Sequence, residues 1–463
     1  MALWKHQEEA VTWAFPRRRT ILNHGMGSGK TRTTIEVLLR DLAADGTLKA
    51  LVCCPKAVIA AWVKQVGLWC PHVRVVPLDK GTSAAKEKAL LAALADTSPL
   101  LVVCNYESVW RIKAVEKTKW TALVWDEIHR LKSPSGVTSR WAGRMAKANP
   151  QARKLGLTGT LIPHSVLDAW AIYRAIEAPD CPTFGTSFTI HKATYAVIAA
   201  GQNWVVGYRN LPQAHAKIAA TTHRVESKDV LDLPPISYDD VACELSPAEA
   251  RLYREVENEF CAVCESGVVT VANALVQLLR LQQICGGYVR FDDDDVSQLI
   301  ADNPAKAAVL RDMLEDLPSD EPVVIFARFT SDIAAVLEVC RKLDRPASEL
   351  SGKKNQLADW QQGTTTVLVS QIQSGGIGVD MTRASYCWFY SLGYSLAEYE
   401  QAVARLHRPG QAKHTHIYHL TATINGRSTV DGRVHKAIRE RKEVVDELLV
   451  GYKQRLNARP ASR

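Results

Sequence analysis

The segment that most constrains the fold is a glycine-rich turn, His24-Gly25-Met26-Gly27-Ser28-Gly29-Lys30-Thr31. Residues 20–22 before it are apolar, and residues 33–39 after it carry apolar side chains at helical spacing. A strand, a glycine turn and a helix start form a phosphate cradle, because backbone N–H groups and the helix dipole both favour an anion there. Lys30 is expected to reach the outer phosphates, and the Thr31 hydroxyl is expected to bind Mg²⁺.

The same turn departs from the strict phosphate-loop pattern in one place. G-x-x-x-x-G-K-[ST] has glycine at its first position, and this chain has His24 there. The alternative is a glycine-rich turn that binds nothing. Gly27, Gly29, Lys30 and Thr31 are all present, so we favour the phosphate cradle.

Two series of short apolar segments predict an α/β fold. Residues 50–54, 100–104 and 122–125 are apolar throughout, which is typical of parallel strands buried on both faces. Residues 323–327, 366–370, 387–390 and 416–420 form a second series. The segments between strands suit crossover helices. A chain of 463 residues exceeds what one core usually supports, so we expect two doubly wound parallel-sheet lobes.

The domain boundary is expected at Leu233-Pro234-Pro235, because paired prolines interrupt regular structure. The lobes would then cover residues 1–232 and 233–463. A mostly helical insertion is expected at about 165–220, where the strand series weakens. A second is expected at about 246–300, starting at the helix-capping sequence Ser246-Pro247-Ala248-Glu249. A basic C-terminal helix is expected at about 430–456.

Composition gives some indication of the cellular compartment and of the type of binding partner. The net charge of +8 suits a polyanionic partner but is weak evidence for nucleic acid. The 11 cysteines lie scattered, often in apolar runs, as in a reducing compartment. Cys261 and Cys264 are a lone pair on an expected helix, and a zinc site would need four ligands. We see no signal peptide and no membrane-spanning run, so we expect a cytoplasmic protein.

Two further groups of residues suit ATP hydrolysis. Asp126 and Glu127 follow an apolar strand, at the sheet edge where α/β folds bind ligands. Asp126 is expected to hold Mg²⁺ and Glu127 to polarise the attacking water, although an acidic pair could merely cap the next helix. Arg405 and Arg408 are three residues apart, so we expect them to share a helix face and to clamp a γ-phosphate. The alternative is a pair of solvated arginines.

In combination, these segments and several others resemble the Swi/Snf-type ATPases of helicase superfamily two, along nearly the whole chain. The ending His407-Arg408-Pro409-Gly410-Gln411 is strongly Swi/Snf-like. The resembling segments are 3–7 (the Q element), 27–31 (motif I), 55–56 with Trp62 (motif Ia), 105–107, 126–132 (motif II), 157–160 (motif III), 278–285, 324–326 (motif IV), 374–380 (motif V) and 401–411 (motif VI).

The chain departs from the family pattern at a few positions. His24 and Gly25 stand where an Asp-Glu pair is usual, Leu161 replaces a proline, and Asp380 replaces an asparagine. Gly393-Tyr394-Ser395-Leu396 occupies the region of the usual Trp-Asn-Pro. None of these changes removes a phosphate or magnesium ligand. These differences suggest a divergent branch similar to compact bacterial or phage-encoded members, which implies the cytoplasm of a bacterium or of a phage-infected host.

The resemblance implies two RecA-like lobes that bind ATP and Mg²⁺ between them and move on double-stranded or branched DNA. The implied catalytic residues are Lys30, Asp126, Glu127, Arg405 and Arg408. The implied ATP-binding residues are Gln7, Gly27, Ser28, Gly29, Lys30, Thr31, Gly378 and Asp380, with Thr31 and Asp126 as metal ligands. The implied DNA-binding residues are Lys56, Asn105, Tyr106, Thr158, Gly352, Lys353 and Ser370.

The leading hypothesis is a DNA-stimulated ATPase that translocates on double-stranded DNA and remodels DNA structures or protein–DNA complexes in replication, repair or recombination. One alternative is a strand-separating helicase acting on DNA or RNA. Another is a nucleotide-gated DNA-binding loader with weak hydrolysis. We expect a monomer without a membrane partner, because one chain supplies both the phosphate loop and the arginines.

Overall fold

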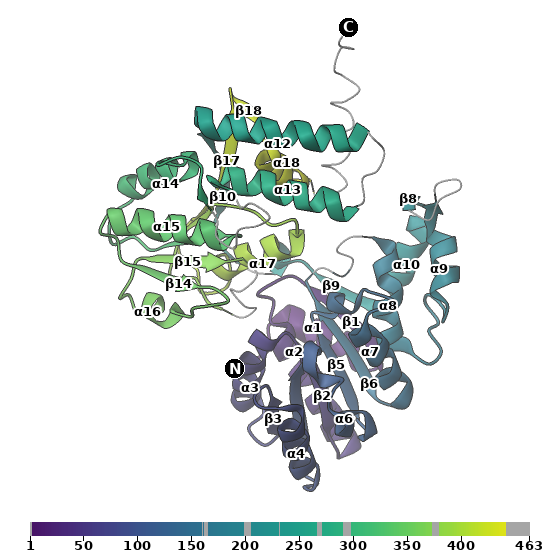
Figure 1. Ribbon diagram of the computed structural model, residues 1–463. Helices are drawn as coiled ribbons and strands as arrows, with labels where there is room; N and C mark the ends of the chain where they lie inside the picture. The colour runs from purple at the N-terminus through teal and green to yellow at the C-terminus, as the bar shows by residue number, and fades with distance from the viewer. Residues whose placement is uncertain are drawn as a thin grey trace. The chain divides into compact units, whose positions relative to one another are not determined.

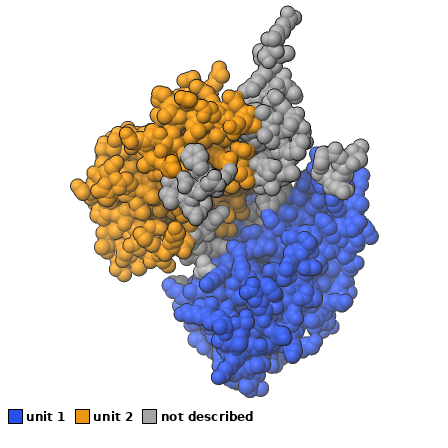
Figure 2. Space-filling view, viewed as in Figure 1, with its two compact units in different colours: residues 1–232 blue, residues 233–463 orange. Residues whose placement is uncertain are grey.

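The chain divides into two units, residues 1–232 and 233–463, each built on its own parallel β-sheet (Figures 1 and 2). The coordinates are a computed structural model. They describe residues 2–159, 161, 165–198, 205–230, 232–265, 271–289, 298–372 and 379–440.

The sheet of the first unit has seven strands, and all of its strand pairs are parallel. Its strands β2, β4 and β5 are the three apolar segments expected from the sequence, and their interior positions are buried. In sheet order the strands are β3 (Arg74–Leu78), β4 (Leu100–Asn105), β2 (Lys49–Cys54), β5 (Ala122–Asp126), β6 (Arg153–Thr158), β1 (Arg19–His24) and β9 (Thr222–Val225).

Helices connect these parallel strands, as crossovers require. The indole rings of Trp125 on β5 and Trp141 on α7 meet edge to face at 5.9 Å, so they join the sheet to a covering helix. The helices of this part are α1 (Lys5–Ala14), α2 (Lys30–Asp45), η1 (Lys56–Val58), α3 (Ile59–Trp69), α4 (Ser83–Leu94), α5 (Tyr106–Val109), α6 (Lys113–Lys117), η2 (Ile128–Leu131) and α7 (Val137–Ala148).

The region expected as a helical insertion contains helices and one small hairpin. The helices are α8 (Val166–Glu177), α9 (Phe188–Tyr195), α10 (Leu211–Thr221) and, further on, α11 (Ser227–Val230). The hairpin pairs β7 (Ala196–Ile198) with β8 (Val205–Tyr208) in antiparallel register. The sequence did not indicate it, because Val197, Ile198 and Val206 are exposed although they are apolar.

The main sheet of the second unit has parallel strand pairs, and one short additional strand pairs in antiparallel register. Its order is β10 (Ile236–Glu244), β17 (Thr415–Ile424), β16 (Tyr386–Phe389), β13 (Val323–Ala327), β15 (Val367–Gln371) and β14 (Ala347–Leu350). Short strand β18 (Arg427–Ser428) pairs with β17 in antiparallel register. The four apolar segments of the second series lie on β13, β15, β16 and β17.

The second unit also contains a helical hairpin and several covering helices. Ser246 and Glu249 form the expected capping box, with each backbone N–H bound by the other side chain at 2.8 and 3.3 Å. The elements are α12 (Pro247–Glu265), α13 (Val271–Cys285), β11 (Tyr288–Val289), β12 (Gln298–Leu299), α14 (Ala305–Asp316), α15 (Thr330–Lys342), α16 (Leu357–Gln361), α17 (Leu396–Leu406) and α18 (Val430–Arg439). Of the expected C-terminal helix, residues 441–456 lie outside the described residues.

A membrane-spanning helix is absent from the described ranges, because none of their helices is both long and apolar enough.

Candidate nucleotide-binding site

The glycine-rich turn joins the end of β1 to the start of α2. β1 ends at His24 and α2 begins at Lys30, so residues 25–29 form the loop between them. Gly27 and Gly29 have φ angles of 78° and 79°, which glycine adopts without steric cost. The loop therefore has the strand–turn–helix context that a phosphate cradle requires.

Gln7 packs directly onto this loop. A Cβ atom at Gly29 would lie 2.2 Å from Gln7 Nε2, so residue 29 must be glycine for Gln7 to occupy its position. Gln7 Nε2 donates to the Ser28 carbonyl at 3.3 Å, and the Trp4 N–H donates to Gln7 Oε1 at 3.0 Å. The predicted adenine-reading residue is therefore held against the phosphate loop at the start of α1.

Lys30 folds back over the loop. Its Nζ donates to the carbonyl oxygens of His24 at 2.9 Å and Gly25 at 3.4 Å. Thr31 follows on the first turn of α2 and is half-buried as a residue. Lys30 thus holds its ammonium group against the start of the loop, and Thr31 is the next residue along the chain.

The unusual residue of the loop, His24, faces strand β9. Its Nε2 lies 3.0 Å from His223 Nδ1, and the two rings meet edge to face at 5.1 Å. Burial, together with the charges of His223, Lys30 and His6, lowers the pKa of His24 to about 3. His24 is therefore a neutral, buried side chain that packs away from the loop, and its carbonyl is the group that Lys30 contacts.

The acidic pair lies at the same sheet edge as the loop. β6 is hydrogen-bonded to β1 on one side and to β5 on the other, and all three run parallel. Their carboxyl ends therefore bring together the loop, Thr158 at the end of β6 and Asp126 at the end of β5. Glu127 leaves the strand with a φ of 52°, a left-handed conformation that turns the chain into η2.

Asp126 is buried and anchored by two aromatic side chains. Trp62 Nε1 donates to Asp126 Oδ2 at 2.8 Å, and the Tyr106 hydroxyl donates to the Asp126 carbonyl at 2.8 Å. Burial, and then the charge of Glu127, raise the pKa of Asp126 to about 6, while the Trp62 hydrogen bond and Lys30 oppose that rise. The anchoring role of Trp62 was not predicted, because an indole 64 residues upstream carries no signal for it in one sequence.

Glu127 is buried beside a histidine. Its Oε2 lies 3.3 Å from His129 Nδ1, which is also 3.1 Å from the hydroxyl of Thr158. Burial favours a raised pKa for Glu127, but the hydrogen bond and charge of His129, together with Lys30 and Arg130, hold it below the ordinary value. Glu127 is thus a carboxylate at neutral pH, and His129 joins it to the end of β6.

The residues at this edge fit a magnesium ion. Mg²⁺ prefers hard oxygen ligands, and the Asp126 carboxylate and the Thr31 hydroxyl are of that kind. Glu127 Oε2 adds a buried carboxylate oxygen next to Asp126 in the chain, and His129 Nδ1 lies 3.3 Å from it. Trp62 fixes one oxygen of Asp126, as outer partners of metal ligands commonly do.

Comparisons with known proteins agree with this geometry. The sequence profile of the SNF2-related domain matches residues 6–287, which is more than half of the chain, and that of the helicase conserved C-terminal domain matches residues 305–410. The chain belongs to the SNF2-related family of helicase-like ATPases. Its two parallel-sheet units are accordingly RecA-like lobes.

Similar proteins include bacterial and phage members of the family. An uncharacterized ATP-dependent helicase of Mycoplasma genitalium is 24% identical over 97% of this chain, which spans only 42% of that protein. Protein p41 of Acyrthosiphon pisum secondary endosymbiont phage 1 is 24% identical over 95% of this chain and 98% of its own length. The solved Sulfolobus solfataricus SWI2/SNF2 ATPase core in complex with dsDNA is 19% identical, covers 99% of this chain and 95% of its own, and has a TM-score of 0.45.

The arginines of SNF2-type motif VI differ from the sequence expectation in one respect. Arg405 lies on α17, but the helix ends at Leu406, so Arg408 does not share a helix face with it. The cause is Pro409, which disfavours a helical conformation in the residue before it. Arg408 is instead part of the turn that follows, and its pairing with Arg405 on one face was wrong.

Both arginines have buried nitrogen atoms. Arg405 Nη1 and Arg408 Nε make no hydrogen bond with any described residue. Burial lowers the pKa of Arg405 to about 10, so it stays charged at neutral pH. A buried guanidinium nitrogen without a hydrogen bond is costly unless a ligand satisfies it.

Asp380 of motif V forms a local turn. Its Oδ1 accepts hydrogen bonds from the Thr382 N–H at 3.0 Å and the Thr382 hydroxyl at 2.8 Å, and its side chain is exposed. Gly378, the other ATP-binding residue predicted in this motif, lies outside the described residues.

The predicted DNA-side residues fall into two groups. Lys56, Gly352 and Lys353 are exposed. The other four, Asn105, Tyr106, Thr158 and Ser370, are buried. The Tyr106 hydroxyl is engaged by Asp126, and Asn105 Nδ2 donates to Glu107 at 2.8 Å. In this structure, therefore, the side chains of the second group are buried in the interior of their units.

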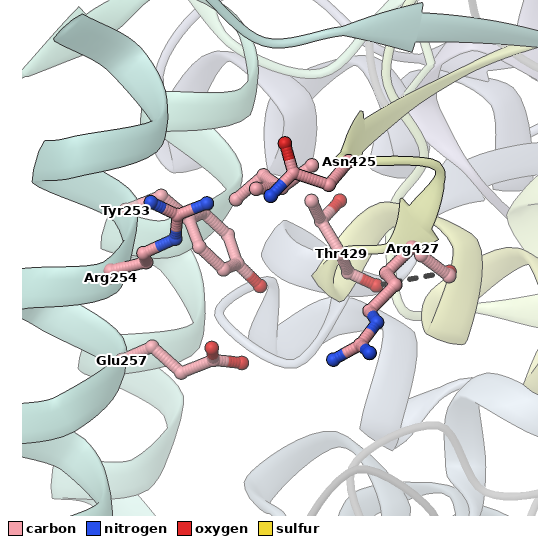
Figure 3. Close-up of a pocket in the computed structure, with 8 residues that line it drawn as sticks. Tyr253, Arg254, Glu257, Asn425, Arg427 and Thr429 are labelled. Carbon is pink, nitrogen blue, oxygen red and sulfur yellow. Dashed lines mark hydrogen bonds between the residues drawn. The ribbon is translucent and has the colours of Figure 1, made fainter. Parts of the chain in front are cut away.

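A cavity of about 620 Å³ lies elsewhere, on the second unit (Figure 3). Tyr253, Arg254 and Glu257 of α12 line one side. Five residues around the turn between β17 and β18 line the other: Ile424, Asn425, Arg427, Ser428 and Thr429. None of the predicted site residues lines it, so the motifs and this cavity mark different places.

Proposed function

We propose that this chain is a DNA-stimulated ATPase that translocates on double-stranded DNA and remodels DNA structures or protein–DNA complexes. One observation carries the ATPase part. Lys30 follows the loop after β1, Asp126 ends β5 and Glu127 follows it, so all three lie at one sheet edge, and the positive charge of Lys30 favours the charged form of both carboxyls. A cation, a metal-binding carboxylate and a second carboxylate are the groups that phosphoryl transfer to water requires.

We assign these groups distinct roles. The loop N–H groups and Lys30 bind the phosphates, while Thr31 and Asp126 would hold Mg²⁺. The ion, when bound, neutralises phosphate charge and acts as a Lewis acid. Glu127 orients the attacking water, which its low pKa supports because a carboxylate must accept the water's hydrogen bond. Gln7 contacts the base, since its amide already lies against the loop.

Arg405 and Arg408 are assigned to the charge that builds up on the transferred phosphate. Their buried, unpartnered nitrogen atoms among the described residues support an anionic ligand. An arginine in this role contributes about 10³–10⁵ to the rate. Because the same chain supplies the loop and the arginines, we propose that it acts as a monomer.

Double-stranded or branched DNA is the proposed track. Membership of the SNF2-related family and a net charge of +8 both favour it. Among the predicted contacts, the exposed Lys56, Gly352 and Lys353 are the residues that could reach a phosphate backbone without rearrangement. Contacts of this kind are independent of base sequence and weaken steeply with salt.

The test is ATP hydrolysis without nucleic acid and with single-stranded, double-stranded and forked DNA and RNA. We expect the greatest stimulation by double-stranded or forked DNA, with no unwinding of a partial duplex. Greater stimulation by RNA would contradict the proposed track, and efficient unwinding would establish a strand-separating helicase instead.

A further inference from the structure

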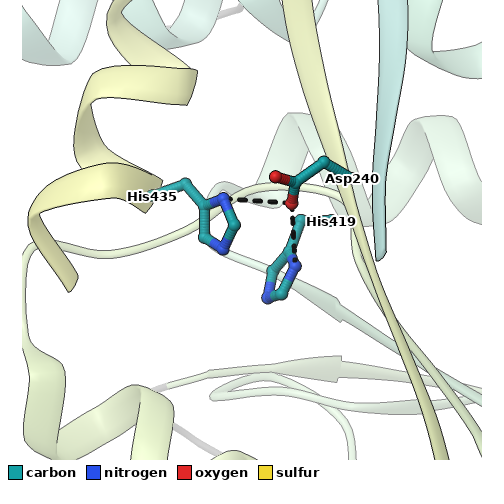
Figure 4. A group of neighbouring side chains, drawn as sticks. All are labelled: Asp240, His419 and His435. Atoms are coloured by element: carbon teal, nitrogen blue, oxygen red, sulfur yellow. Dashed lines mark ion pairs between the residues drawn. The ribbon is translucent and has the colours of Figure 1, made fainter. Parts of the chain in front are cut away.

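Three side chains of types that bind metal ions converge on the second unit (Figure 4). Asp240 lies on β10, His419 on β17 and His435 on α18. β10 and β17 pair in parallel, and Asp240 is directly opposite His419 in their register. The cluster therefore follows from strand pairing across a long sequence separation, which is why no local motif indicates it.

The donor atoms lie at separations that suit one ion. Asp240 Oδ1 is 3.4 Å from His419 Nδ1 and 3.1 Å from His435 Nδ1, and one donor atom from each residue lies within 4.8 Å of the others. A tetrahedral ion with bonds of about 2.0–2.1 Å holds its ligand atoms about 3.3 Å apart. The carboxylate oxygen and both imidazoles thus need only small shifts to share one ion.

Both histidines are suited to bind as neutral ligands. His419 is 1% exposed, and its Nδ1 makes no hydrogen bond within the described ranges. Burial, together with the charge of His435, lowers the pKa of His419 to about 3, and burial also lowers that of His435. The two rings stack with centroids 3.9 Å apart. Two protonated imidazoles would repel one another at this distance, so the stacking favours the neutral forms.

A second helix supplies an outer partner. The Tyr399 hydroxyl of α17 lies 3.0 Å from His419 Nε2, the ring nitrogen that faces away from Asp240. A metal-binding histidine usually donates its second N–H to such a group, which fixes the tautomer. The charge of Arg439 lowers the pKa of both histidines, which favours their neutral, metal-binding forms, but the same charge repels a cation.

We propose that Asp240, His419 and His435 bind one divalent transition-metal ion, with Zn²⁺ the best match. Two imidazoles and one carboxylate form a common ligand set for such ions. Mg²⁺ and Ca²⁺ prefer all-oxygen sites and are not expected to bind. The Asp240 side chain is 47% exposed, so the open side has room for a water molecule as fourth ligand. The ion fastens α18 to β10 and β17 and serves no step of ATP hydrolysis.

The experiment measures metal binding to the full chain rather than enzymatic activity. The protein is stripped with EDTA and dialysed against Zn²⁺, or against Co²⁺ for its visible absorption, with Mg²⁺ present throughout. The variants are Asp240→Asn and His435→Gln. Asp240→Asn changes a half-exposed side chain and should fold, which its melting curve in EDTA verifies. The matched control is His414→Gln, because His414 is exposed and stacks on His416 at 4.3 Å outside the cluster.

We expect the wild type to bind one more equivalent of Zn²⁺ than either variant, and Zn²⁺ to raise its melting temperature by several degrees. The variants should bind at least tenfold more weakly and show no such rise, while the control behaves as the wild type. Equal binding by wild type and variants, no binding by the wild type, or loss of the ion in His414→Gln would each overturn the proposal.

Discussion

Trp62 donates a hydrogen bond of 2.8 Å from its indole nitrogen to Asp126 Oδ2. This contact links α3 to the carboxylate that we assign to Mg²⁺, and it opposes the rise that burial causes in the pKa of Asp126. Trp62→Phe keeps most of the volume and removes the donor. We expect the apparent affinity for Mg²⁺ to fall about 10- to 100-fold. The acid limb of the pH–rate profile should also move to higher pH, because the Trp62 hydrogen bond lowers the pKa of Asp126.

The measurement for Trp62→Phe is ATPase rate against Mg²⁺ concentration at several pH values. Trp141→Phe is the matched control, because Trp141 is also fully buried but its Nε1 makes no hydrogen bond with the described residues. An unchanged Mg²⁺ dependence in Trp62→Phe would contradict the anchoring role.

Gly29→Ala tests the contact between the loop and Gln7. The new Cβ would lie 2.2 Å from Gln7 Nε2, so the amide must leave its place against Ser28. We expect a loss of ATP affinity at least as large as that of Gln7→Ala, measured by titration calorimetry. Gly46→Ala is the control for backbone strain, because Gly46 has a φ of 69° and nothing within 4 Å of a Cβ. It should lose about 1–2 kcal/mol of stability and keep ATP affinity.

Stability should fall as the pH drops below the ordinary pKa of histidine. His24 has a folded-state pKa of about 3 against 6.5 for the ordinary group, so the unfolded chain takes up a proton first. The stabilisation is complete above pH 6.5 and is lost as the pH falls towards 3, by about 1.4 kcal/mol per pH unit. Denaturant titrations at pH 7.5 and 5.5 should show a smaller decline in His24→Asn than in the wild type. The exposed His72→Asn should not change the decline.

Arg408→Ala should reduce the catalytic rate far more than nucleotide binding. We expect kcat to fall about 10³- to 10⁵-fold, since the charge is needed when the phosphate transfers. The Kd for ATP should change little. The control is Arg341→Ala, an exposed arginine that pairs with Glu338 at 2.7 Å. Equal losses in rate and affinity would mean that Arg408 binds the ground state.

Most of the sheet architecture could be predicted because a strand that is buried on both faces has apolar residues at consecutive positions, and this pattern is visible in the sequence. Strands such as β2, β4 and β13 are apolar at nearly every position. The β7–β8 hairpin was missed because its side chains are largely exposed, so no core constrains their pattern. The helix through Arg408 was predicted wrongly because spacing was given more weight than the proline that follows.

The candidate site was predictable where the backbone itself forms it. The residue types in the loop of residues 25–29 and in the acidic pair, together with the apolar strands before them, were enough to predict both features. The partners that tune the site were not predictable, since Trp62 and His223 reach Asp126 and His24 only through tertiary packing. The same holds for Asp240 and His419, which strand register alone brings together.

The central claim is that the edge carrying Lys30, Asp126 and Glu127 hydrolyses ATP under the control of double-stranded DNA. The most direct measurement is steady-state ATP hydrolysis by the wild type and by Glu127→Gln, with and without a double-stranded DNA of mixed sequence. We predict strong stimulation of the wild type, and no turnover by the variant although it still binds ATP. Substantial turnover by Glu127→Gln, or a wild-type rate that double-stranded DNA does not change, would contradict the account.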